Sequence, residues 1–354
     1  MMSHEVTIEP TGDVVEVAEG QTILDAALRS GAYLPHACVH GLCGTCKVEV
    51  LEGEVEHGDA SHFALMDMER EEGWCLACTA TPLTDVVIEA DLEVEEDARN
   101  FPVRDFVGEV VRIEELSPRI RGIFLDLGDD TLEFQAGQYI NLSVPGVDRP
   151  RAYSIASVPE EGSRLELNVG LVPGGKASTW LHEELEVGSR LSFTGPYGRF
   201  FVRTSRPEPI LFLAGGSGLS SPKSMILDLL ATGDTHEITL VYGARDRADL
   251  YYRGLFEELA AEHANFRYLP VLSAEPEDSP WEGLRGFVHE AAAEIYGGRF
   301  EGNTAYLCGP PPMVDACVTT LMRGRLFERD MYLENFFDES SAQSRNRSPL
   351  FKVI

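Results

Sequence analysis

The chain has 354 residues, 44% of them hydrophobic, which is enough for about two or three globular domains. Its 59 acidic and 29 basic residues give a formal net charge of −30, which argues against nucleic acid as a partner because phosphates would be repelled. No apolar run is long enough to cross a membrane, and the first residues lack the basic and apolar regions of a signal peptide. We therefore expect a cytoplasmic protein with reduced thiols and no membrane partner.

The acidic charge is concentrated in the N-terminal part of the chain. Residues 1–100 contain 22 Asp or Glu and four Arg or Lys, a net charge of −18. A surface of this kind keeps a protein soluble, and it can also steer a basic protein partner toward a docking site. Both interpretations stay open from the sequence.

Residues 1–95 form the first predicted domain, a small sheet with one helix packed on it. A helix is expected over 22–30, where Thr22 and Asp25 can form the N-terminal cap and Gly31 can end the helix. Short stretches with the composition of strands occur at 6–9, 14–17, 47–50 and 86–89. A charged segment poor in apolar residues follows, and we assign 96–103 to a linker.

The rest of the chain changes from a strand-rich pattern to alternating strands and helices. Residues 104–205 contain short strands separated by Gly, Pro and Asp turns, which is typical of an antiparallel β-barrel. From 206 to 337 apolar strands alternate with helices, and the run at 210–214 fits a strand buried on both faces. We therefore predict a multi-domain fold with α+β and α/β parts, a doubly wound parallel sheet in the last domain, and a C-terminal tail at 338–354.

The most specific motif is a set of four cysteines. Cys38, Cys43 and Cys46 have the C-x4-C-x2-C spacing of plant-type [2Fe–2S] ferredoxins, which use one more distant cysteine as the fourth ligand. Cys78 can supply that thiolate. Glycines between the first three cysteines would let the backbone curl around a cluster. The sequence therefore predicts an iron–sulfur centre that transfers single electrons.

Two other uses of the cysteines are weaker alternatives. Cys43-x2-Cys46 and Cys75-x2-Cys78 could form a zinc ribbon, although the gap between the two pairs is longer than usual. Zinc would leave Cys38 unused, whereas the cluster leaves Cys75 unused. A disulfide framework is disfavoured by the odd count of seven cysteines and by the length of the chain.

Two motifs in the α/β domain follow strands. Gly215-Gly216-Ser217-Gly218 comes directly after 210–214 and before a helix, where backbone N–H groups can bind a pyrophosphate. Only part of the dinucleotide fingerprint is present, so an ordinary tight turn is the alternative. Cys308 begins a Cys-Gly-Pro-Pro-Pro-Met segment at the end of another strand, either as a small buried side chain or beside an apolar floor for a nicotinamide.

Two further motifs lie in the barrel region. Arg151-Ala152-Tyr153-Ser154 offers a guanidinium for a phosphate, an aromatic face for a ring and a short hydroxyl. Gly174-Gly175-Lys176-Ala177-Ser178 is a glycine turn before a helix, which is either a phosphate site or a simple helix cap. Neither motif is specific on its own.

Taken in order, the motifs Arg-x-Tyr-Ser, Gly-Gly-x-x-Ser, Gly-Pro-Tyr-Gly, Gly-Gly-Ser-Gly and Cys-Gly-Pro-Pro-Pro-Met resemble those of the ferredoxin–NADP reductase superfamily. With the cysteine motif in front, the chain resembles the reductase components of bacterial multicomponent oxygenases, above all the phenol hydroxylase reductases. The resemblance implies a β-grasp ferredoxin domain, an FAD-binding β-barrel and an NAD(P)-binding domain. One residue departs from the pattern, because relatives often have proline where this chain has Ser221.

The resemblance also implies roles for individual residues. The residues that would bind FAD are Arg151, Tyr153, Ser154, Gly174, Gly175 and Ser178. The residues that would bind the nicotinamide dinucleotide are Gly216, Gly218 and Cys308. Glu334 and Phe336 would belong to an acidic-aromatic segment beside the flavin. The catalytic residues would be Ser154, Cys308 and Glu334.

These assignments imply an oxidoreductase that passes electrons from NADH to FAD, to the [2Fe–2S] cluster and on to the hydroxylase component of a phenol or aromatic monooxygenase. Arg245 and Asp246, after the second strand of the α/β domain, offer both charges, so NADPH is not excluded. The reductase of a ring-hydroxylating dioxygenase or of an alkane or ether monooxygenase is an alternative. A non-catalytic redox sensor or zinc-binding interaction protein is the alternative from another class.

Overall fold

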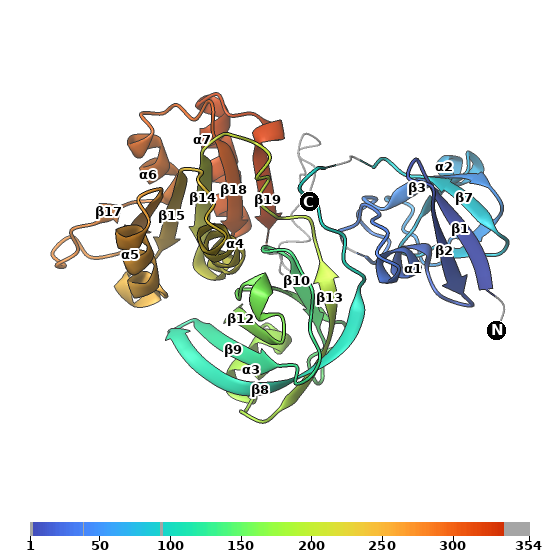
Figure 1. The fold of residues 1–354 in the computed structure, drawn as a ribbon, viewed down its shortest axis with the longest axis horizontal. Coiled ribbons are helices and arrows are strands. Elements are labelled where there is room, and N and C mark those ends of the chain that lie inside the picture. Colours follow the sequence, from blue (N-terminus) through green and yellow to red (C-terminus); the bar gives the residue numbers. More distant parts are fainter. Residues whose placement is uncertain (1–2, 38, 93–94, 336–354) are drawn as a thin grey trace. The chain divides into compact units, whose positions relative to one another are not determined.

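The structure is a computed structural model that describes residues 3–37, 39–92 and 95–335. It divides into two compact units, Met1–Arg104 and Asp105–Ile354, the second of which contains both a barrel and a parallel sheet (Figure 1). Cys38, Phe336 and the tail 338–354 lie outside the described residues.

The N-terminal unit is built around a five-stranded sheet with the strand order β2-β1-β7-β3-β5. β1 pairs with β7 in parallel and with β2 in antiparallel orientation. This small mixed sheet with a helix confirms the predicted β-grasp type of domain. Its elements are β1 (Ser3–Glu9), β2 (Asp13–Ala18), α1 (Ile23–Arg29), β3 (Lys47–Glu52), β4 (Val55–Glu56), α2 (Asp67–Glu71), β5 (Trp74–Leu76), β6 (Thr81–Pro82) and β7 (Val86–Glu89).

Helix α1 has the ends that its sequence predicts. The Thr22 side chain accepts a hydrogen bond from the backbone N–H of Asp25 at 3.3 Å, which satisfies one of the free donors of the first turn. Gly31 has a φ of +81°, a conformation that favours glycine after a helix. Val103, at the end of the predicted linker, is buried and donates its N–H to the Leu28 carbonyl at 2.9 Å, so this part of the linker packs on the helix.

The barrel is a six-stranded antiparallel sheet with the order β11-β10-β13-β8-β9-β12. Along β12, Leu165, Leu167 and Val169 belong to the barrel core, so Glu166 and Asn168 point to the opposite face. This alternation matters for the site below. The elements are β8 (Arg104–Ser117), β9 (Ile120–Asp126), β10 (Tyr139–Leu142), β11 (Arg151–Ser154), η1 (Pro159–Glu161), β12 (Arg164–Gly170), α3 (Lys176–Glu183) and β13 (Arg190–Tyr197).

The last part of the chain is a six-stranded parallel sheet with the order β17-β16-β15-β14-β18-β19 and helices on both faces (Figure 1). It confirms the predicted doubly wound fold. The elements are β14 (Ile210–Gly215), η2 (Gly216–Leu219), α4 (Ser220–Ala231), β15 (Ile238–Ala244), η3 (Arg247–Asp249), α5 (Arg253–Glu262), β16 (Phe266–Leu272), β17 (Leu284–Arg285), α6 (Val288–Ile295), β18 (Thr304–Gly309), α7 (Pro311–Arg323), η4 (Glu328–Asp330) and β19 (Met331–Asn335).

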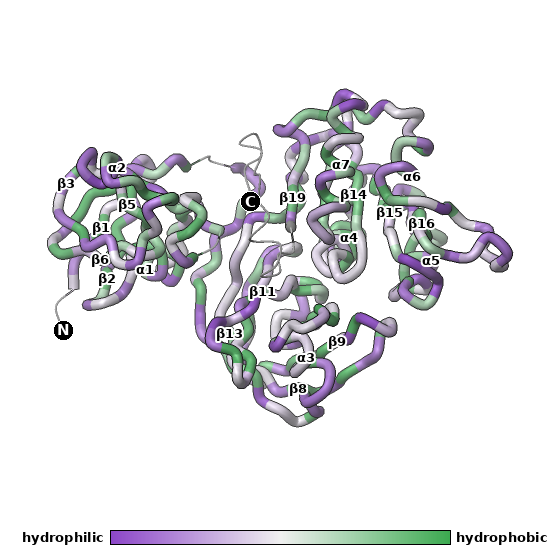
Figure 2. Tube along the Cα trace, turned by 180° about the vertical axis from the view of Figure 1, so that it is seen from behind, coloured by the Kyte–Doolittle hydropathy of each residue, from purple (hydrophilic) through white to green (hydrophobic). Residues whose placement is uncertain are grey.

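The central strands of this sheet are apolar because they are covered on both faces. Every residue of β14 and β18 is buried, and Figure 2 shows hydrophobic colouring along most of β14. Pro270 is tolerated in β16 because the short β17 pairs only with Val271 and Leu272 further along the strand. Among the described residues, no helix combines the length and the apolar character that crossing a bilayer requires.

Candidate cofactor and electron-transfer sites

Antiparallel pairing of β3 with β5 brings two of the predicted cluster ligands together. Val48 lies opposite Cys75, and just beyond this pair the N–H of Ala77 donates to the Cys46 carbonyl at 2.9 Å. This register places Cys46 beside Cys78. A hydrogen bond between the two sulfurs raises the pKa of Cys46 and lowers the pKa of Cys78.

The cysteine loop points backbone N–H groups at the sulfur atoms. The N–H of Gly41 donates to the Cys78 sulfur at 3.3 Å, and the N–H of Thr45 donates to the Cys43 sulfur at 3.5 Å. Such donors stabilise the thiolate form that binds iron. Gly41 has a φ of +71°, and a Cβ there would lie 2.9 Å from a methyl carbon of Thr79, so this close turn requires glycine. The loop therefore fits anionic ligands of a cluster.

Cys75 is placed differently from the predicted ligands. It is fully buried, and burial raises its pKa to about 12, so the thiol stays protonated at neutral pH. The zinc alternative would need Cys75 as a thiolate ligand, whereas its thiol is buried within strand β5 and protonated. This arrangement does not support the zinc ribbon. The prediction that Cys38 completes the cluster falls outside the described residues.

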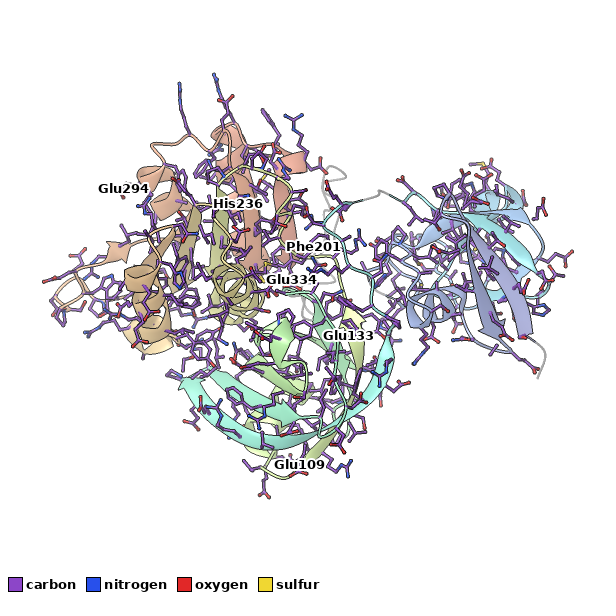
Figure 3. All side chains as sticks on the ribbon, in the orientation of Figure 1. Glu109, Glu133, Phe201, His236, Glu294 and Glu334 are labelled. Atoms are coloured by element: carbon purple, nitrogen blue, oxygen red, sulfur yellow. The ribbon has the colours of Figure 1, made fainter. Side chains whose placement is uncertain are left out.

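Residues from four elements meet around the carboxyl of Glu334, at the end of β19. Its Oε2 atom accepts hydrogen bonds from Ser221 Oγ at 2.5 Å, from Cys308 Sγ at 3.2 Å and from Ser154 Oγ at 3.3 Å. Figure 3 labels Glu334 where the parallel sheet faces the barrel. The three residues predicted to be catalytic are thus neighbours, although Ser154 and Glu334 are 180 residues apart in the chain.

The electrostatics of this cluster follow from its burial. Burial raises the pKa of Glu334, while the hydrogen bonds from its three neighbours oppose the shift by stabilising the carboxylate. Burial also raises the pKa of the Cys308 thiol, and the adjacent carboxylate raises it further. Cys308 is therefore a neutral donor at this position. The cluster presents one carboxylate held by two hydroxyls and one thiol.

The predicted phosphate turn lies beside this cluster. Gly216 has a φ of +56° and open space where a Cβ would be, so its backbone is accessible to a ligand. A Cβ on Gly218 would lie 2.3 Å from the carbonyl oxygen of Cys308, which explains the need for glycine there. The Tyr251 hydroxyl donates to the Gly216 carbonyl at 3.2 Å and fixes the turn from the other side. An open turn at the end of β14 fits a dinucleotide pyrophosphate.

Asn168 is a polar residue near this turn that the sequence analysis did not single out. It is only 5% exposed, and neither atom of its side-chain amide has a hydrogen-bond partner among the described residues. It shares a face of β12 with Gly170, whose Cβ position would lie 3.0 Å from Ser217 Oγ in the turn. Buried polar groups normally have partners, so this amide fits a polar ligand bound between β12 and the turn. In the sequence, Asn168 alternates with the apolar residues Leu165, Leu167 and Val169, as Glu166 does, which is the pattern of a strand with one polar face.

The predicted flavin residues on β11 are in place but carry no specific flavin signature. The Arg151 guanidinium donates to the carbonyls of Arg149 at 2.9 Å and Pro150 at 3.4 Å. Burial raises the pKa of the Tyr153 phenol to about 12, so the ring is neutral. Ser154 is buried and turned toward Glu334. The roles of Arg151 and Tyr153 in binding FAD stay predictions.

The glycine turn before α3 is held by the Ser178 hydroxyl, while Gly175 at the N-cap position has no side chain to cap the helix. The Ser178 hydroxyl accepts from the N–H of Val172 at 3.1 Å and donates to the Gly175 carbonyl at 3.2 Å. Gly174 has a φ of +75° and no heavy atom within 4 Å of a Cβ position. The turn is therefore held by the Ser178 hydroxyl and open to a ligand at Gly174, and its phosphate role stays a prediction.

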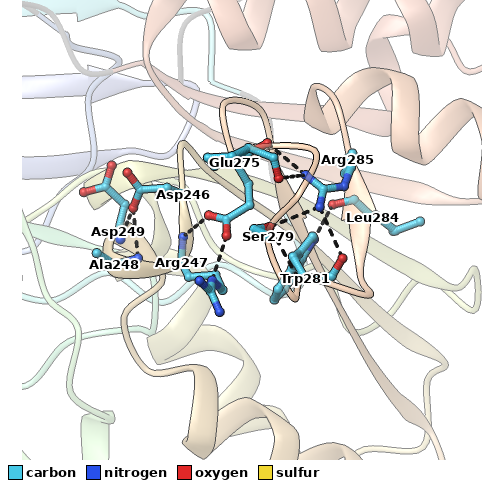
Figure 4. Close-up of polar contacts among 10 residues, drawn as sticks. Asp246, Arg247, Ala248, Asp249, Glu275, Ser279, Trp281, Leu284 and Arg285 are labelled. Carbon is cyan, nitrogen blue, oxygen red and sulfur yellow. Dashed lines mark hydrogen bonds and ion pairs between the residues drawn. The ribbon is translucent and has the colours of Figure 1, made fainter.

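A charged cluster forms where β15 and β16 end (Figure 4). Arg247 Nε lies 2.7 Å from Glu275 Oε1, and the backbone N–H of Arg247 donates to Oε2 of the same carboxylate at 3.1 Å. Arg285 donates to the Glu275 carbonyl at 2.8 Å and holds the loop in place. Asp246 accepts two backbone N–H groups of η3 and acts as its cap. The sequence analysis named Asp246 but missed Glu275, which lies in the loop after the next strand.

Three family models match successive parts of the chain. Family models match at residues 6–83 (2Fe-2S iron-sulfur cluster binding domain), 108–202 (oxidoreductase FAD-binding domain) and 212–319 (oxidoreductase NAD-binding domain). The chain is 56% identical to the reductase component of phenol 2-monooxygenase from Pseudomonas sp. (strain CF600) and 52% identical to the phenol hydroxylase P5 protein from Acinetobacter pittii (strain PHEA-2), over the full length of each. The crystal structure of the Amycolatopsis reductase GcoB is 37% identical, with a TM-score of 0.83, covering 94% of this chain and 98% of that one.

The fold and the matched domains define a flavin and iron–sulfur oxidoreductase that uses a nicotinamide dinucleotide. The chain belongs to the oxygenase reductases of the phenol hydroxylase type, within the ferredoxin–NADP reductase superfamily. The predicted cofactors FAD, [2Fe–2S] and NADH are confirmed at the level of whole domains. The assignment of single residues to them stays a prediction.

Proposed function

We propose that this chain carries electrons from NADH to the hydroxylase component of an oxygenase that acts on phenol or a related aromatic compound. When bound, FAD can accept two electrons together and release them one at a time, and a [2Fe–2S] cluster transfers one electron at a time. The observation that carries the proposal is the contact of Glu334 with both Ser154 and Cys308. It joins the predicted flavin strand of the barrel to the predicted nicotinamide edge of the parallel sheet.

The residues of the chain would position both ring systems at this junction. Ser154 and Cys308 are buried and neutral, so they can act as hydrogen-bond donors without placing a charge against an apolar ring. Gly218 keeps the Cys308 backbone accessible, because any side chain there would clash with the Cys308 carbonyl. Burial of these groups excludes water from the place where the two rings would meet.

The test begins with the purified full-length protein loaded with flavin and cluster. Under anaerobic conditions we expect NADH to bleach the flavin absorbance, and we expect phenol hydroxylation once the hydroxylase component of a phenol monooxygenase is added. Failure of NADH to reduce the flavin would contradict the oxidoreductase assignment. If the reduced protein supports the activity of a ring-hydroxylating dioxygenase but not that of a phenol hydroxylase, the proposed partner is wrong.

We further infer that the partner docks on the N-terminal unit beside the cluster. Phe63 is 100% exposed, Leu42 is 62% exposed and Met66 is 52% exposed, and we call these three residues the apolar patch. Leu42 precedes the predicted ligand Cys43, and the Ser61 N–H donates to the Gly41 carbonyl at 3.0 Å, which ties the Phe63 segment to the cysteine loop. Exposed apolar side chains in a strongly acidic unit match a partner with an apolar centre and a basic rim.

Phe63→Ser tests this docking surface. We expect a higher KM for the hydroxylase component, with unchanged reduction of the flavin by NADH, because the apolar patch contributes to docking only. Phe327→Ser is the control, since Phe327 is 54% exposed but lies just before η4 in the other unit. Equal KM values for wild type and Phe63→Ser would contradict docking at this patch.

The charges at the ends of β15 and β16 support NADH rather than NADPH as the donor. Glu275 neutralises Arg247, and the same loop carries Glu277 and Asp278 as further acidic residues. A 2′-phosphate beside Arg247 would meet a guanidinium that is already paired with Glu275. We therefore propose that NADPH is the poorer substrate.

A further inference from the structure

Ser221 follows the predicted phosphate turn at the start of helix α4. It is the second residue of α4 and is fully buried. Its hydroxyl lies 2.5 Å from Glu334 Oε2, closer than either of the other two donors to that atom. A proline side chain has no donor, so this chain makes a hydrogen bond that a proline at position 221 could not provide.

The start of α4 is held firmly, so the Ser221 hydroxyl has a defined position. Two residues further along, Lys223 Nζ donates to the Ala156 carbonyl at 2.9 Å. Ser224 Oγ donates to the Ser157 carbonyl at 2.6 Å. Both acceptors belong to the barrel segment that directly follows Ser154. The same helix turn therefore contacts Glu334 on one side and the backbone behind Ser154 on the other.

We propose that Ser221 is a positioning residue for the reaction, whose hydroxyl holds the Glu334 carboxylate between Ser154 and Cys308. The inference rests on the proposed function, because it gives Glu334 a part in the oxidation of NADH. Three donors converge on one oxygen, and the shortest bond does most to fix the rotamer and the ionised state of the acid. Ser221 acts through Glu334 rather than on the substrate itself.

The surroundings of Glu334 make this hydrogen bond important. Cys308 on β18 is the titratable group in contact with it, and burial keeps that thiol neutral. Lys223 on α4 is paired with Glu166 and is not directed at Glu334. Among the described residues, no cation is identified as stabilising the Glu334 carboxylate. Removing the Ser221 hydroxyl should therefore raise the pKa of Glu334 further.

The test is the pH profile of flavin reduction by NADH, measured anaerobically with the loaded full-length protein. For Ser221→Ala we expect the acid limb of the maximal rate to move upward by about one pH unit, because a hydrogen bond to a charged group is lost. We expect the KM for NADH to change much less than the rate at low pH. Ser221→Thr keeps a hydroxyl, so the acid limb of its maximal rate should lie at the wild-type pH.

Two further variants separate positioning from folding. Ser224→Ala removes an equally buried hydroxyl from the same helix, but one bonded to Ser157, so its acid limb should stay at the wild-type pH. Ser221→Pro also removes the hydroxyl, with a residue that the first turn of a helix tolerates, and it should shift the acid limb as Ser221→Ala does. A wild-type acid limb in both Ser221→Ala and Ser221→Pro would overturn the inference. If NADH fails to reduce the flavin of the wild-type protein, the proposed function is wrong instead.

Discussion

The ammonium group of Lys223 lies 2.7 Å from the carboxylate of Glu166, and both side chains are buried where helix α4 meets strand β12 of the barrel. The second oxygen of Glu166 accepts a hydrogen bond from the Tyr252 hydroxyl at 2.6 Å. The pair therefore joins the barrel to the parallel sheet close to the cluster around Glu334. Such a pair is sensitive to the loss of one partner, because the remaining charge stays buried without compensation.

Lys223→Met should strongly destabilise the junction between barrel and parallel sheet. It leaves the Glu166 carboxylate without its cation, and we expect a loss of about 3–5 kcal/mol in the stability of this unit. The double variant Lys223→Met with Glu166→Gln should recover part of that loss, because no charge remains buried. Thermal unfolding followed by flavin fluorescence measures both. The exposed Arg164→Met is the control, and we expect it to change stability by less than about 1 kcal/mol. Equal midpoints for Lys223→Met and Arg164→Met would contradict this account.

Cys75→Ser and Cys78→Ser should have opposite effects on the cluster. Cys75 lies in the sheet core, so its serine variant should keep iron and sulfide at wild-type levels, with some loss of stability from burying a hydroxyl. Cys78→Ser should lose the cluster, because it removes a predicted thiolate ligand. Flavin reduction by NADH should continue in both variants. The measurement is the iron and labile sulfide content of each variant. Loss of iron in Cys75→Ser but not in Cys78→Ser would mean that Cys75, not Cys78, is the ligand.

The sequence was sufficient to predict the three types of domain, because each has a strong local signal. The spacing of Cys43 and Cys46, the strand-rich region after residue 104 and the buried run at 210–214 each depend on neighbours in the chain. The cap of α1 at Thr22 was predictable for the same reason. Such features are fixed by backbone preferences and hydrophobic periodicity, which a single sequence displays.

The contacts between distant segments could not be predicted in the same way. The contacts of Ser221, Lys223 and Asn168 cannot be read from the sequence, because they depend on which residues face them across the junction. Lys223 would be expected at the surface, yet its partner Glu166 is 57 residues away and allows it to be buried. Glu275 was missed because it reaches the charged loop after β15 from the loop after β16. Position in three dimensions, not local pattern, gives these residues their partners.

Glu275→Gln should weaken the preference for NADH over NADPH. The substitution removes the carboxylate that pairs with Arg247, so the guanidinium becomes available to a 2′-phosphate. We expect kcat/KM for NADPH to rise by about tenfold, which corresponds to one charge-assisted hydrogen bond. The value for NADH should change little. Steady-state kinetics with both nucleotides provides the measurement.

Glu277→Gln is the matched control for this change, because it removes one acidic charge from the same loop without freeing Arg247. If both variants raise kcat/KM for NADPH equally, the general charge of the loop, rather than the Arg247–Glu275 pair, sets the preference. If neither variant changes it, the adenosine end of the nucleotide does not bind at this cluster.

His236 should make the stability of the parallel-sheet domain depend on pH. Its Nδ1 lies 2.7 Å from Asp234 Oδ1 and its Nε2 lies 2.6 Å from the Arg206 carbonyl, so both ring nitrogens face acceptors and the protonated ring satisfies both. Burial lowers the pKa of His236, but the hydrogen bonds to Asp234 and to the Arg206 carbonyl outweigh burial and raise the pKa above its ordinary value. The stabilisation is therefore complete below the unfolded pKa of about 6.5 and is lost as the pH rises through the higher folded pKa.

We accordingly expect the melting temperature of the wild type to fall as the pH rises above about 6.5, with a contribution of about 1–2 kcal/mol from the charged hydrogen bonds. His236→Gln should be less stable at pH 6 and should show a flatter dependence on pH, because glutamine does not titrate. His263→Gln, at the C-terminal end of α5, controls for the removal of a histidine elsewhere in the domain. The interpretation fails if His236→Gln follows the wild-type pH dependence, since the titrating group would then lie elsewhere.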